Sequence, residues 1–157
     1  MSVEEMSQAR FESVLDEIAS LLRTEAQAKP FIEAKQFENR VREATQSIIG
    51  PGVIDFSPHA QAFPDIAVGK FGIEVKFTTN DTWRSVANSV LETNRIEEVS
   101  KVYVMFGKMG GTPDVRWGEY EKCVMHVRTS HVPRFEVQID ATRSLFEIMG
   151  ISYDQFR

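Results

Sequence analysis

The hydrophobic and polar positions of this chain follow two different periods, which divide it into helical and extended segments. Residues 3–27 repeat apolar side chains at three- and four-residue steps, and this spacing predicts an amphipathic helix. A second helix is predicted from Pro30, a residue suited to a first helical turn, to Ile49, with Gly50 ending it. Its apolar stripe consists of Phe37, Val41, Ala44 and Ile48. Glu38 lies at the edge of that stripe.

The middle of the chain changes to the alternating pattern of β-strands. Residues 51–62 are expected to form a loop that contains a short strand at Val53–Phe56. Two further strands are predicted at Phe63–Val68 and Phe71–Phe77, because β-branched and aromatic residues dominate both. The Gly69-Lys70 pair between them predicts a turn, so the two strands form a hairpin.

The segment after the hairpin shows a helical pattern followed by a buried strand. Residues 80–95, NDTWRSVANSVLETNR, are predicted to form a helix capped by Asn80 or Asp81. The continuous apolar run KVYVMF at 101–106 is typical of a central strand buried on both faces. Residues 107–114, GKMGGTPD, are expected to form a mobile loop.

Two strands and a helix complete the predicted order of elements. The strands are predicted at 121–129 and 134–139, and the helix at 140–150, ending at Gly150. The order α, α, β, β, α, β, β, β, α predicts an α/β fold, with a mixed β-sheet flanked by helices. One domain is expected over 1–157, divided into N-terminal helices at 1–49, a core sheet at 50–140 and a closing helix at 141–157.

Composition and charge narrow the class of protein. The chain has 157 residues, 42% hydrophobic and 26% charged, as in an ordinary globular domain. No apolar run is long enough to cross a membrane, and the acidic N-terminus lacks the layout of a secretory signal. The single Cys123 fits a reducing compartment, so a cytoplasmic protein with no membrane partner is expected. The net charge of −5 argues against coating nucleic acid by bulk electrostatics, but it allows a local basic surface.

The predicted hairpin carries three charges that a buried sheet would normally exclude: Asp65, Glu74 and Lys76. Side chains two residues apart on a strand share a face, so Glu74 and Lys76 point the same way. Asp65 begins the neighbouring strand and can lie across from them. Two carboxylates and an ammonium are therefore expected to converge at one end of the sheet. Two adjacent carboxylates repel each other, and a proton or a hard divalent cation such as Mg²⁺ relieves that repulsion.

Pro64-Asp65, followed after eight residues by Glu74-Val75-Lys76, resembles the PD-(D/E)xK motif of restriction-endonuclease-like nucleases. The upstream segment FENRVREA resembles the helix that supplies a further acidic residue in many members of that family, here Glu38. The predicted order of elements from residue 30 to about 140 also resembles the core of the family. The resemblance implies a restriction-endonuclease-like fold and a phosphodiester hydrolase.

The resemblance also implies a role for each residue. Asp65 and Glu74 would hold Mg²⁺, with the backbone carbonyl of Val75 as a third ligand, and Mn²⁺ is expected to substitute. Lys76 would orient or help deprotonate the attacking water and stabilise charge in the transition state. Glu38 would position a water molecule or help hold a second ion. The metal would make hydroxide available near neutral pH and act as a Lewis acid.

The residues expected to contact nucleic acid follow the predicted catalytic strand in the sequence. Hydroxyl, amide, arginine and histidine side chains suit contacts with phosphates and base edges. The candidates are Thr78, Thr79, Asn80, Arg84, Arg128, Ser130, His131 and Arg134. An arginine on a strand is more often solvated or ion-paired, so that interpretation stays open for each one.

These features together predict a Mg²⁺-dependent endonuclease for double-stranded DNA, of the type II restriction class. A single small domain reaches both DNA strands most simply as a homodimer with twofold symmetry. Three alternatives stay open. The chain could be a repair or recombination nuclease, or a catalytically inactive or auxiliary nucleic-acid-binding member of the same fold. Glu74 and Lys76 could also form an ordinary surface ion pair on an edge strand, with Asp65 as a turn residue.

Overall fold

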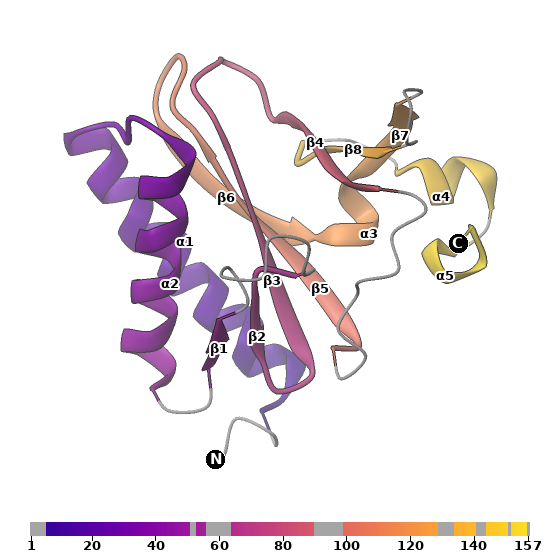
Figure 1. The fold of residues 1–157 in the computed structure, drawn as a ribbon, viewed down its shortest axis with the longest axis horizontal. Coiled ribbons are helices and arrows are strands. Elements are labelled where there is room, and N and C mark those ends of the chain that lie inside the picture. The colour runs from indigo at the N-terminus through magenta and orange to yellow at the C-terminus, as the bar shows by residue number, and fades with distance from the viewer. Residues whose placement is uncertain are drawn as a thin grey trace.

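The computed structural model places two helices against one face of a five-stranded β-sheet and a smaller three-stranded sheet against the other face (Figure 1). The structure describes residues 6–50, 53–55, 64–89, 99–128, 134–140, 144–150 and 152–156. The predicted α/β class, a mixed sheet flanked by helices, is confirmed. The division of the strands between two sheets was not predicted.

The two N-terminal helices are α1 (Gln8–Ala28) and α2 (Ala34–Ile49), close to the predicted positions. The prediction that the second helix begins at Pro30 is wrong. Residues 29–33 form the connection between the two helices, and Pro30 lies within that connection. Gly50 ends α2 as predicted, with a φ of 87° that favours glycine.

The main sheet contains one parallel pair of strands and otherwise antiparallel pairs. Its strands are β1 (Val53–Asp55), β2 (Ile66–Val68), β3 (Phe71–Thr78), β5 (Lys101–Lys108) and β6 (Asp114–Glu119), in the spatial order β1-β2-β3-β5-β6. The predicted short strand and hairpin are confirmed as β1, β2 and β3. The strand predicted to begin at Phe63 begins only at Ile66, because Pro64 and Asp65 form a bend before it, and residue 63 lies outside the described residues. β5 runs parallel to β3 and lies between β3 and β6, which confirms its predicted central position.

The second sheet is antiparallel and has the order β4-β8-β7. Its strands are β4 (Arg84–Ser89), β7 (Val124–Arg128) and β8 (Arg134–Gln138). Three short helices, α3 (Tyr120–Cys123), α4 (Leu145–Met149) and α5 (Tyr153–Phe156), lie near this sheet in Figure 1. Their buried side chains belong to the same apolar cluster as those of the sheet. Among all the helices described, none is both long and apolar enough to cross a membrane.

The helix predicted at 80–95 is wrong for its first half, because Arg84–Ser89 forms β4. This strand pairs with β8, where Arg84 lies opposite Gln138 and Ser85 lies opposite Val137. Pairing with a strand that is distant in sequence overrides the local helical pattern. Residues 90–98, the remainder of that prediction, lie outside the described residues.

The loop expected at 107–114 is shorter than predicted and tightly packed, because β5 continues through Lys108. The Lys108 Nζ donates hydrogen bonds to the carbonyl oxygens of Gly110 and Thr112, at 2.6 and 3.2 Å. A Cβ atom on Gly110 would lie 2.3 Å from the carbonyl carbon of Asn80. The loop is therefore held directly against the segment that follows β3, and its mobility stays a prediction.

Strand β6 was absent from the predicted order, although its residues alternate. Val115 is buried and Trp117 packs against the cluster that contains α1, while Gly118 faces Cys123 on the other side of the sheet. Arg116 interrupts the apolar character of that second face. The alternation was therefore visible, but two apolar side chains were too few to mark a strand.

The two remaining differences concern element boundaries. The strand predicted from residue 121 begins only at Val124, because the preceding residues form α3. The strand predicted at 134–139 is confirmed as β8. The closing helix, predicted at 140–150, is Leu145–Met149, capped by Ser144 and ended by Gly150 as expected. Residues 141–143 lie outside the described residues.

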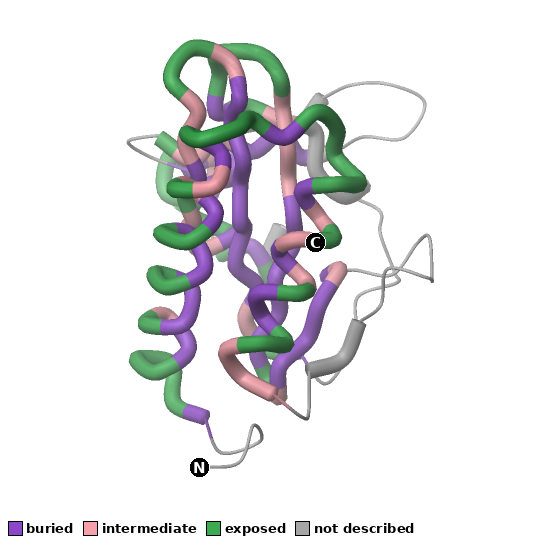
Figure 2. Tube along the Cα trace, turned by 90° about the vertical axis from the view of Figure 1, so that its left-hand side faces the viewer, coloured by how far each residue is buried: buried purple, intermediate pink, exposed green. Residues whose placement is uncertain are grey.

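The apolar core fills both sides of the main sheet. On β5, Tyr103 and Met105 pack with α1 and α2, while Val104 and Phe106 pack with the second sheet. Figure 2 shows burial alternating along the turns of both helices, with the buried side toward the sheet. Glu74 and Lys76 alternate with the helix-facing residues of β3, so they lie on the face of the sheet that carries Val104 and Phe106.

Candidate functional site

The β2–β3 hairpin brings Asp65 to the charged pair on β3. Ile66 lies opposite Ile73 in the antiparallel register, which puts Asp65 next to Glu74 across the two strands. The backbone N–H of Val75 donates a hydrogen bond to Asp65 Oδ2 at 2.9 Å. The structure therefore brings Asp65, Glu74 and Lys76 together, as the alternation along the two strands predicted.

The proline before Asp65 has a structural role in this arrangement. Pro64 is buried and its ring lies over Gly72 on β3. A Cβ atom at residue 72 would lie 2.3 Å from the Pro64 Cγ, so only glycine allows this contact. The contact fixes the start of β2 against β3 and thereby the position of Asp65.

Glu74 is almost completely buried, with 8% of its surface exposed. Its Oε2 lies 3.2 Å from the Lys76 Nζ, and the Lys76 side chain is itself only 17% exposed. Its Oε1 is buried and finds no hydrogen-bond donor in the part of the chain that the structure describes. One oxygen of this carboxylate is thus paired and the other is left without a partner, which is costly for an ionised group.

Burial raises the pKa of Glu74 to about 8. The Lys76 ammonium opposes this shift, and the negative charge of Asp65, which lies within hydrogen-bonding reach of Glu74, adds to it. Two ionised carboxylates cannot donate a hydrogen bond to each other. Near neutral pH, Glu74 therefore keeps a proton that it can share with Asp65, or else a cation must take the place of that proton.

The residues present fit a hard divalent cation. Mg²⁺ is bound in proteins by one or two carboxylates, with the remaining positions filled by water and phosphate oxygens. Asp65 and the partnerless Oε1 of Glu74 supply carboxylate oxygens, and Val75, whose backbone carbonyl is the third predicted ligand, directly follows Glu74 on β3. The described residues contain no group of three or more Asp, Glu, His or Cys side chains arranged to hold a metal. The donor set therefore consists of two carboxylates and backbone oxygen.

Glu38 lies near this site but makes no direct bond to it. The side chain is half-buried on α2, and no hydrogen bond or ion pair joins it to any described residue. Burial raises the pKa of Glu38, and the charge of Asp65 raises it further, while Lys76 partly opposes the shift. The neighbouring Phe37 packs over Gly107 of β5, where a Cβ atom would lie 2.7 Å from the ring. Glu38 therefore lies within the electric field of the site, and its role stays a prediction.

Three of the predicted nucleic-acid contacts lie at the end of β3 or just beyond it. Thr78 is the last residue of the strand, and its hydroxyl accepts a hydrogen bond from the Asn80 N–H at 3.0 Å. Thr79 and Asn80 are exposed. The side chains of Thr79 and Asn80 are thus accessible to a ligand, only a few residues beyond Lys76.

Arg84 lies on β4 rather than on the helix that was predicted for it. Its Nε lies 2.5 Å from Glu136 Oε1, and Glu136 is buried. This ion pair joins β4 to β8 within the second sheet. The structure therefore favours the alternative in which Arg84 is an ion-paired arginine that stabilises the second sheet.

The remaining predicted contacts belong to the β7–β8 hairpin or lie outside the described residues. Arg128 and Arg134 are direct cross-strand partners in the backbone register. The backbone thus places these two positions side by side, as the sequence spacing suggested. Ser130 and His131 lie outside the described residues.

The sequence analysis did not single out three cations that the fold gathers around Trp83: Arg23, Lys108 and Arg116. They come from α1, β5 and β6. For Arg116, the alternating pattern of β6 could have indicated its position, because the pattern places Arg116 on the face opposite Val115 and Trp117. Arg23 gave no signal, since its partner Asp114 is 91 residues away in sequence.

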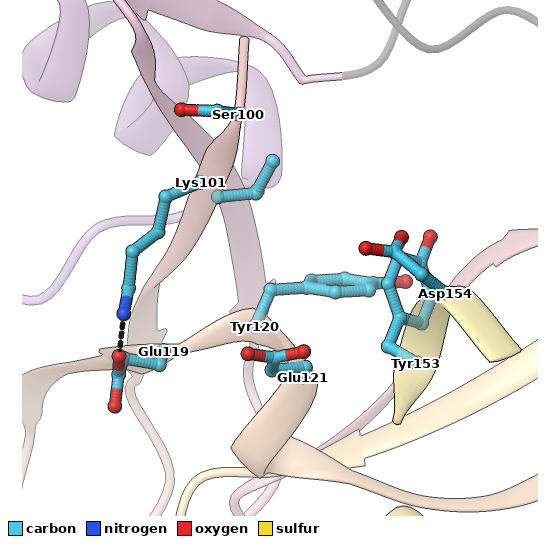
Figure 3. Close-up of a pocket in the computed structure, with 8 residues that line it drawn as sticks. Ser100, Lys101, Glu119, Tyr120, Glu121, Tyr153 and Asp154 are labelled. Atoms are coloured by element: carbon cyan, nitrogen blue, oxygen red, sulfur yellow. Dashed lines mark ion pairs between the residues drawn. The ribbon is translucent and has the colours of Figure 1, made fainter. Parts of the chain in front are cut away.

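A separate cavity of about 120 Å³ lies at the N-terminal end of β5 (Figure 3). Lys101 forms an ion pair with Glu119 on one side of it, and the rings of Tyr120 and Tyr153 meet edge to face on the other. Its lining, as far as the chain is described, contains none of the predicted site residues.

Comparison of the sequence with protein-family models gives no match, and comparison with curated proteins gives none either.

Proposed function

We propose that this protein is a Mg²⁺-dependent DNA endonuclease that hydrolyses phosphodiester bonds, of the type II restriction class. One observation carries the proposal: Asp65 and the buried Glu74 lie within hydrogen-bonding reach, and one Glu74 oxygen has no donor in the described structure. Lys76 stands 3.2 Å from the other oxygen. Two carboxylates beside one ammonium suit a divalent cation and a phosphate together.

Each residue of the site has a separate role in the proposed reaction. Asp65 and Glu74 supply the carboxylate oxygens that hold the cation, and the Val75 N–H fixes the orientation of Asp65. Lys76, whose Nζ lies 3.2 Å from Glu74 Oε2, donates hydrogen bonds to the attacking water or to charge that develops on the phosphoryl oxygens. When bound, Mg²⁺ supplies Lewis-acid activation of the phosphate and of water near neutral pH.

An ordinary surface ion pair explains the same residues less well. A surface pair needs an edge strand and two solvated side chains, but β3 is flanked by β2 on one side and β5 on the other. Both side chains are largely buried. A buried ion pair adds little or no stability to a fold, because both charges lose their hydration. Ligand binding is therefore the better explanation for two charges at this position.

The proposal extends to the assembly and the substrate. A double-strand cut requires two sites, and a homodimer with twofold symmetry supplies them. The exposed Thr79 and Asn80, beyond the end of β3, would contact the backbone of double-stranded DNA near the cleaved bond.

The test is incubation of the protein with supercoiled plasmid DNA in Mg²⁺, Mn²⁺ or EDTA, followed by sequencing of the ends. Wild-type protein should cut with Mg²⁺ and Mn²⁺, and Asp65→Asn should not cut. Glu17→Gln, which removes an exposed carboxylate on α1, is the matched control and should cut like the wild type. Cutting in EDTA, or by Asp65→Asn, would contradict the proposal. DNA binding without any cutting would favour the auxiliary, non-catalytic alternative.

A further inference from the structure

A polar groove with a volume of about 560 Å³ lies beyond the end of β5. It is formed by the C-terminal half of α1, the segment after β3 and the β5–β6 hairpin, which meet at the upper end of the sheet in Figure 1. Its lining residues are Arg23, Gln27, Asp81, Trp83, Lys108, Thr112, Asp114 and Arg116. Three cations and two carboxylates leave one net positive charge in a chain whose total is −5.

Arg116 is held in a fixed orientation at the side of this groove. Its guanidinium lies 4.6 Å from the centre of the Trp83 ring, and its Nε donates to Asp114 Oδ2 at 3.2 Å. No partner binds its two Nη groups in the part of the chain that the structure describes, and the side chain is 48% exposed. A guanidinium that is stacked and fixed by its Nε presents a two-pronged donor edge, which suits phosphate oxygens.

Arg23 shares the same carboxylate from the opposite side. Its Nε donates to Asp114 Oδ1 at 2.6 Å and its Nη2 donates to the Val115 carbonyl at 2.6 Å. Burial alone would raise the pKa of Asp114, but hydrogen bonds from Arg23, the Val115 amide and Arg116 outweigh burial and hold that pKa below its usual value. The carboxylate therefore stays ionised and orients two guanidiniums, although it can neutralise only one of them.

Lys108 adds a positive charge that solvent screens poorly, because the residue is 7% exposed. Its Nζ is bound by Asp81 Oδ1 at 2.8 Å and lies 5.5 Å from the centre of the Trp83 ring. The ammonium is fully occupied, so it contributes electrostatic potential to the groove rather than a direct contact.

Arg116, at one side of the groove, lies on the same face of the sheet as the candidate catalytic residues. Lys76 on β3 and Arg116 on β6 are both register partners of Phe106 on β5, so the three residues form one row across the sheet. Two inter-strand spacings separate the backbone of Lys76 from that of Arg116 by about 10 Å. A DNA strand advances about 3.4 Å per nucleotide along the helix axis, so about three nucleotides cover this distance.

We infer that Arg23 and Arg116 form a second phosphate-binding site, which takes the backbone of the substrate nucleic acid about three nucleotides from the phosphate at Lys76. The inference rests on the proposed nuclease function for the identity of the substrate. The site is built from residues outside the predicted catalytic set, and the guanidinium edge of Arg116 is its main contact.

The first test is the salt dependence of binding to a short fluorescent DNA duplex, measured by anisotropy with Ca²⁺ in place of Mg²⁺. Arg116→Gln and Arg23→Gln should each reduce the slope of log affinity against log salt by about 0.9, the value for one lost phosphate contact. Arg10→Gln removes the same charge from the exposed first turn of α1, about 20 Å from Arg23 along the helix. It should keep the wild-type slope.

A second variant and a second readout separate contact from folding. Arg116→Lys keeps the charge and loses the two-pronged edge, so it should bind more weakly than wild type with most of the salt slope retained. Duplexes with one neutral methylphosphonate linkage should bind wild type more weakly when that linkage is about three nucleotides from the cut. Arg116→Gln should no longer distinguish this linkage from the others.

The outcomes distinguish the two proposals. If wild type cuts DNA but Arg116→Gln keeps the wild-type salt slope, the groove is not a phosphate site and the nuclease proposal stands. Suppose instead that wild type does not cut with any metal, and that the salt slope falls in Arg116→Gln and Arg23→Gln but not in Arg10→Gln. The phosphate-binding role of the groove is then supported, and the nuclease proposal fails. An equal fall of the salt slope in Arg10→Gln would refute the phosphate site, because the slope would then depend on the total charge of the protein and not on the groove.

Discussion

As pH rises, the free energy of unfolding of the wild-type protein should fall because Glu74 ionises. Replacing Glu74 by glutamine should abolish this fall. Burial raises the pKa of Glu74 to about 8, from an ordinary value of 4.5, with Lys76 opposing the shift and Asp65 adding to it. Glutamine keeps the shape of the protonated side chain and cannot ionise. The variant therefore isolates the free energy that the fold loses when this one carboxyl group ionises in the absence of a divalent cation.

The sign follows from the proton count of the two states. Between pH 4.5 and about 8, folded protein holds a proton on Glu74 that the unfolded chain releases. The free energy of unfolding therefore falls as pH rises through this window, and the loss is complete above about 8. At roughly 1.4 kcal/mol for each pH unit, the loss reaches at most roughly 5 kcal/mol. A domain of this size is stable by about 5–15 kcal/mol, so the effect is a large fraction of the total.

The assay is urea unfolding in EDTA at about pH 5, 7 and 9, with the free energy obtained by linear extrapolation. The chain has two tryptophans whose fluorescence reports the transition. Glu74→Gln should match wild type near pH 5 and become increasingly more stable than wild type toward pH 9. Added Mg²⁺ should stabilise wild type at the higher pH and leave the variant unchanged, because a ligand stabilises only the state that binds it.

Glu17→Gln is the control for the loss of one negative charge, because Glu17 is exposed on α1. It should follow wild type at every pH. Parallel pH profiles for wild type and Glu74→Gln would refute the reasoning, since they would mean that Glu74 ionises as readily in the folded protein as in the unfolded chain.

The remaining predictions concern catalysis and the geometry of the hairpin. Lys76→Ala should reduce the single-turnover cleavage rate by roughly 10²–10³-fold while DNA affinity in Ca²⁺ stays near wild type, and an unchanged rate would exclude a catalytic role. Ca²⁺ should support DNA binding without cleavage, because its bonds to oxygen are longer and looser than those of Mg²⁺; efficient cutting in Ca²⁺ alone would contradict this. Gly72→Ala places a Cβ 2.3 Å from Pro64 Cγ and should destabilise the fold by about 1–3 kcal/mol and abolish cleavage by displacing Asp65; full activity in that variant would show that Pro64 does not position the carboxylate.

The parts of the fold that the sequence predicted are those determined by neighbours along the chain. The β2–β3 hairpin needs only alternation and a turn, and the alternation already places Glu74 and Lys76 on one face. The central strand β5 was recognisable because both of its faces are apolar. Local pattern was therefore sufficient for the candidate catalytic cluster, which lies on a single hairpin.

The parts that were missed depend on partners far away in the sequence. β4 carries a pattern that also suits a helix, and its pairing with β8 decides the outcome. β6 has only Val115 and Trp117 to mark its buried face, and its strand character comes from pairing with β5. The groove around Trp83 unites α1, β5 and β6, so no local pattern could have shown that Arg23 and Arg116 share one carboxylate.

The buried position of the charges on the hairpin lowers the stability of the fold, and this loss calls for an explanation. Glu74 lies on an interior strand, between the apolar residues Ile73 and Val75, and one of its oxygens has no donor in the described structure. Buried ion pairs can often be replaced by apolar residues with no loss of stability, so stability alone gives no reason for an acid here. Below about pH 8 a proton on Glu74 relieves the conflict with Asp65, and a divalent cation would relieve it by taking the place of that proton. The same burial that makes the ionised pair unfavourable would also strengthen every interaction with a bound cation and phosphate, because water screens them poorly. The instability of the ionised pair and the proposed chemistry are therefore two consequences of one arrangement, in which Pro64 and Gly72 hold Asp65 against β3.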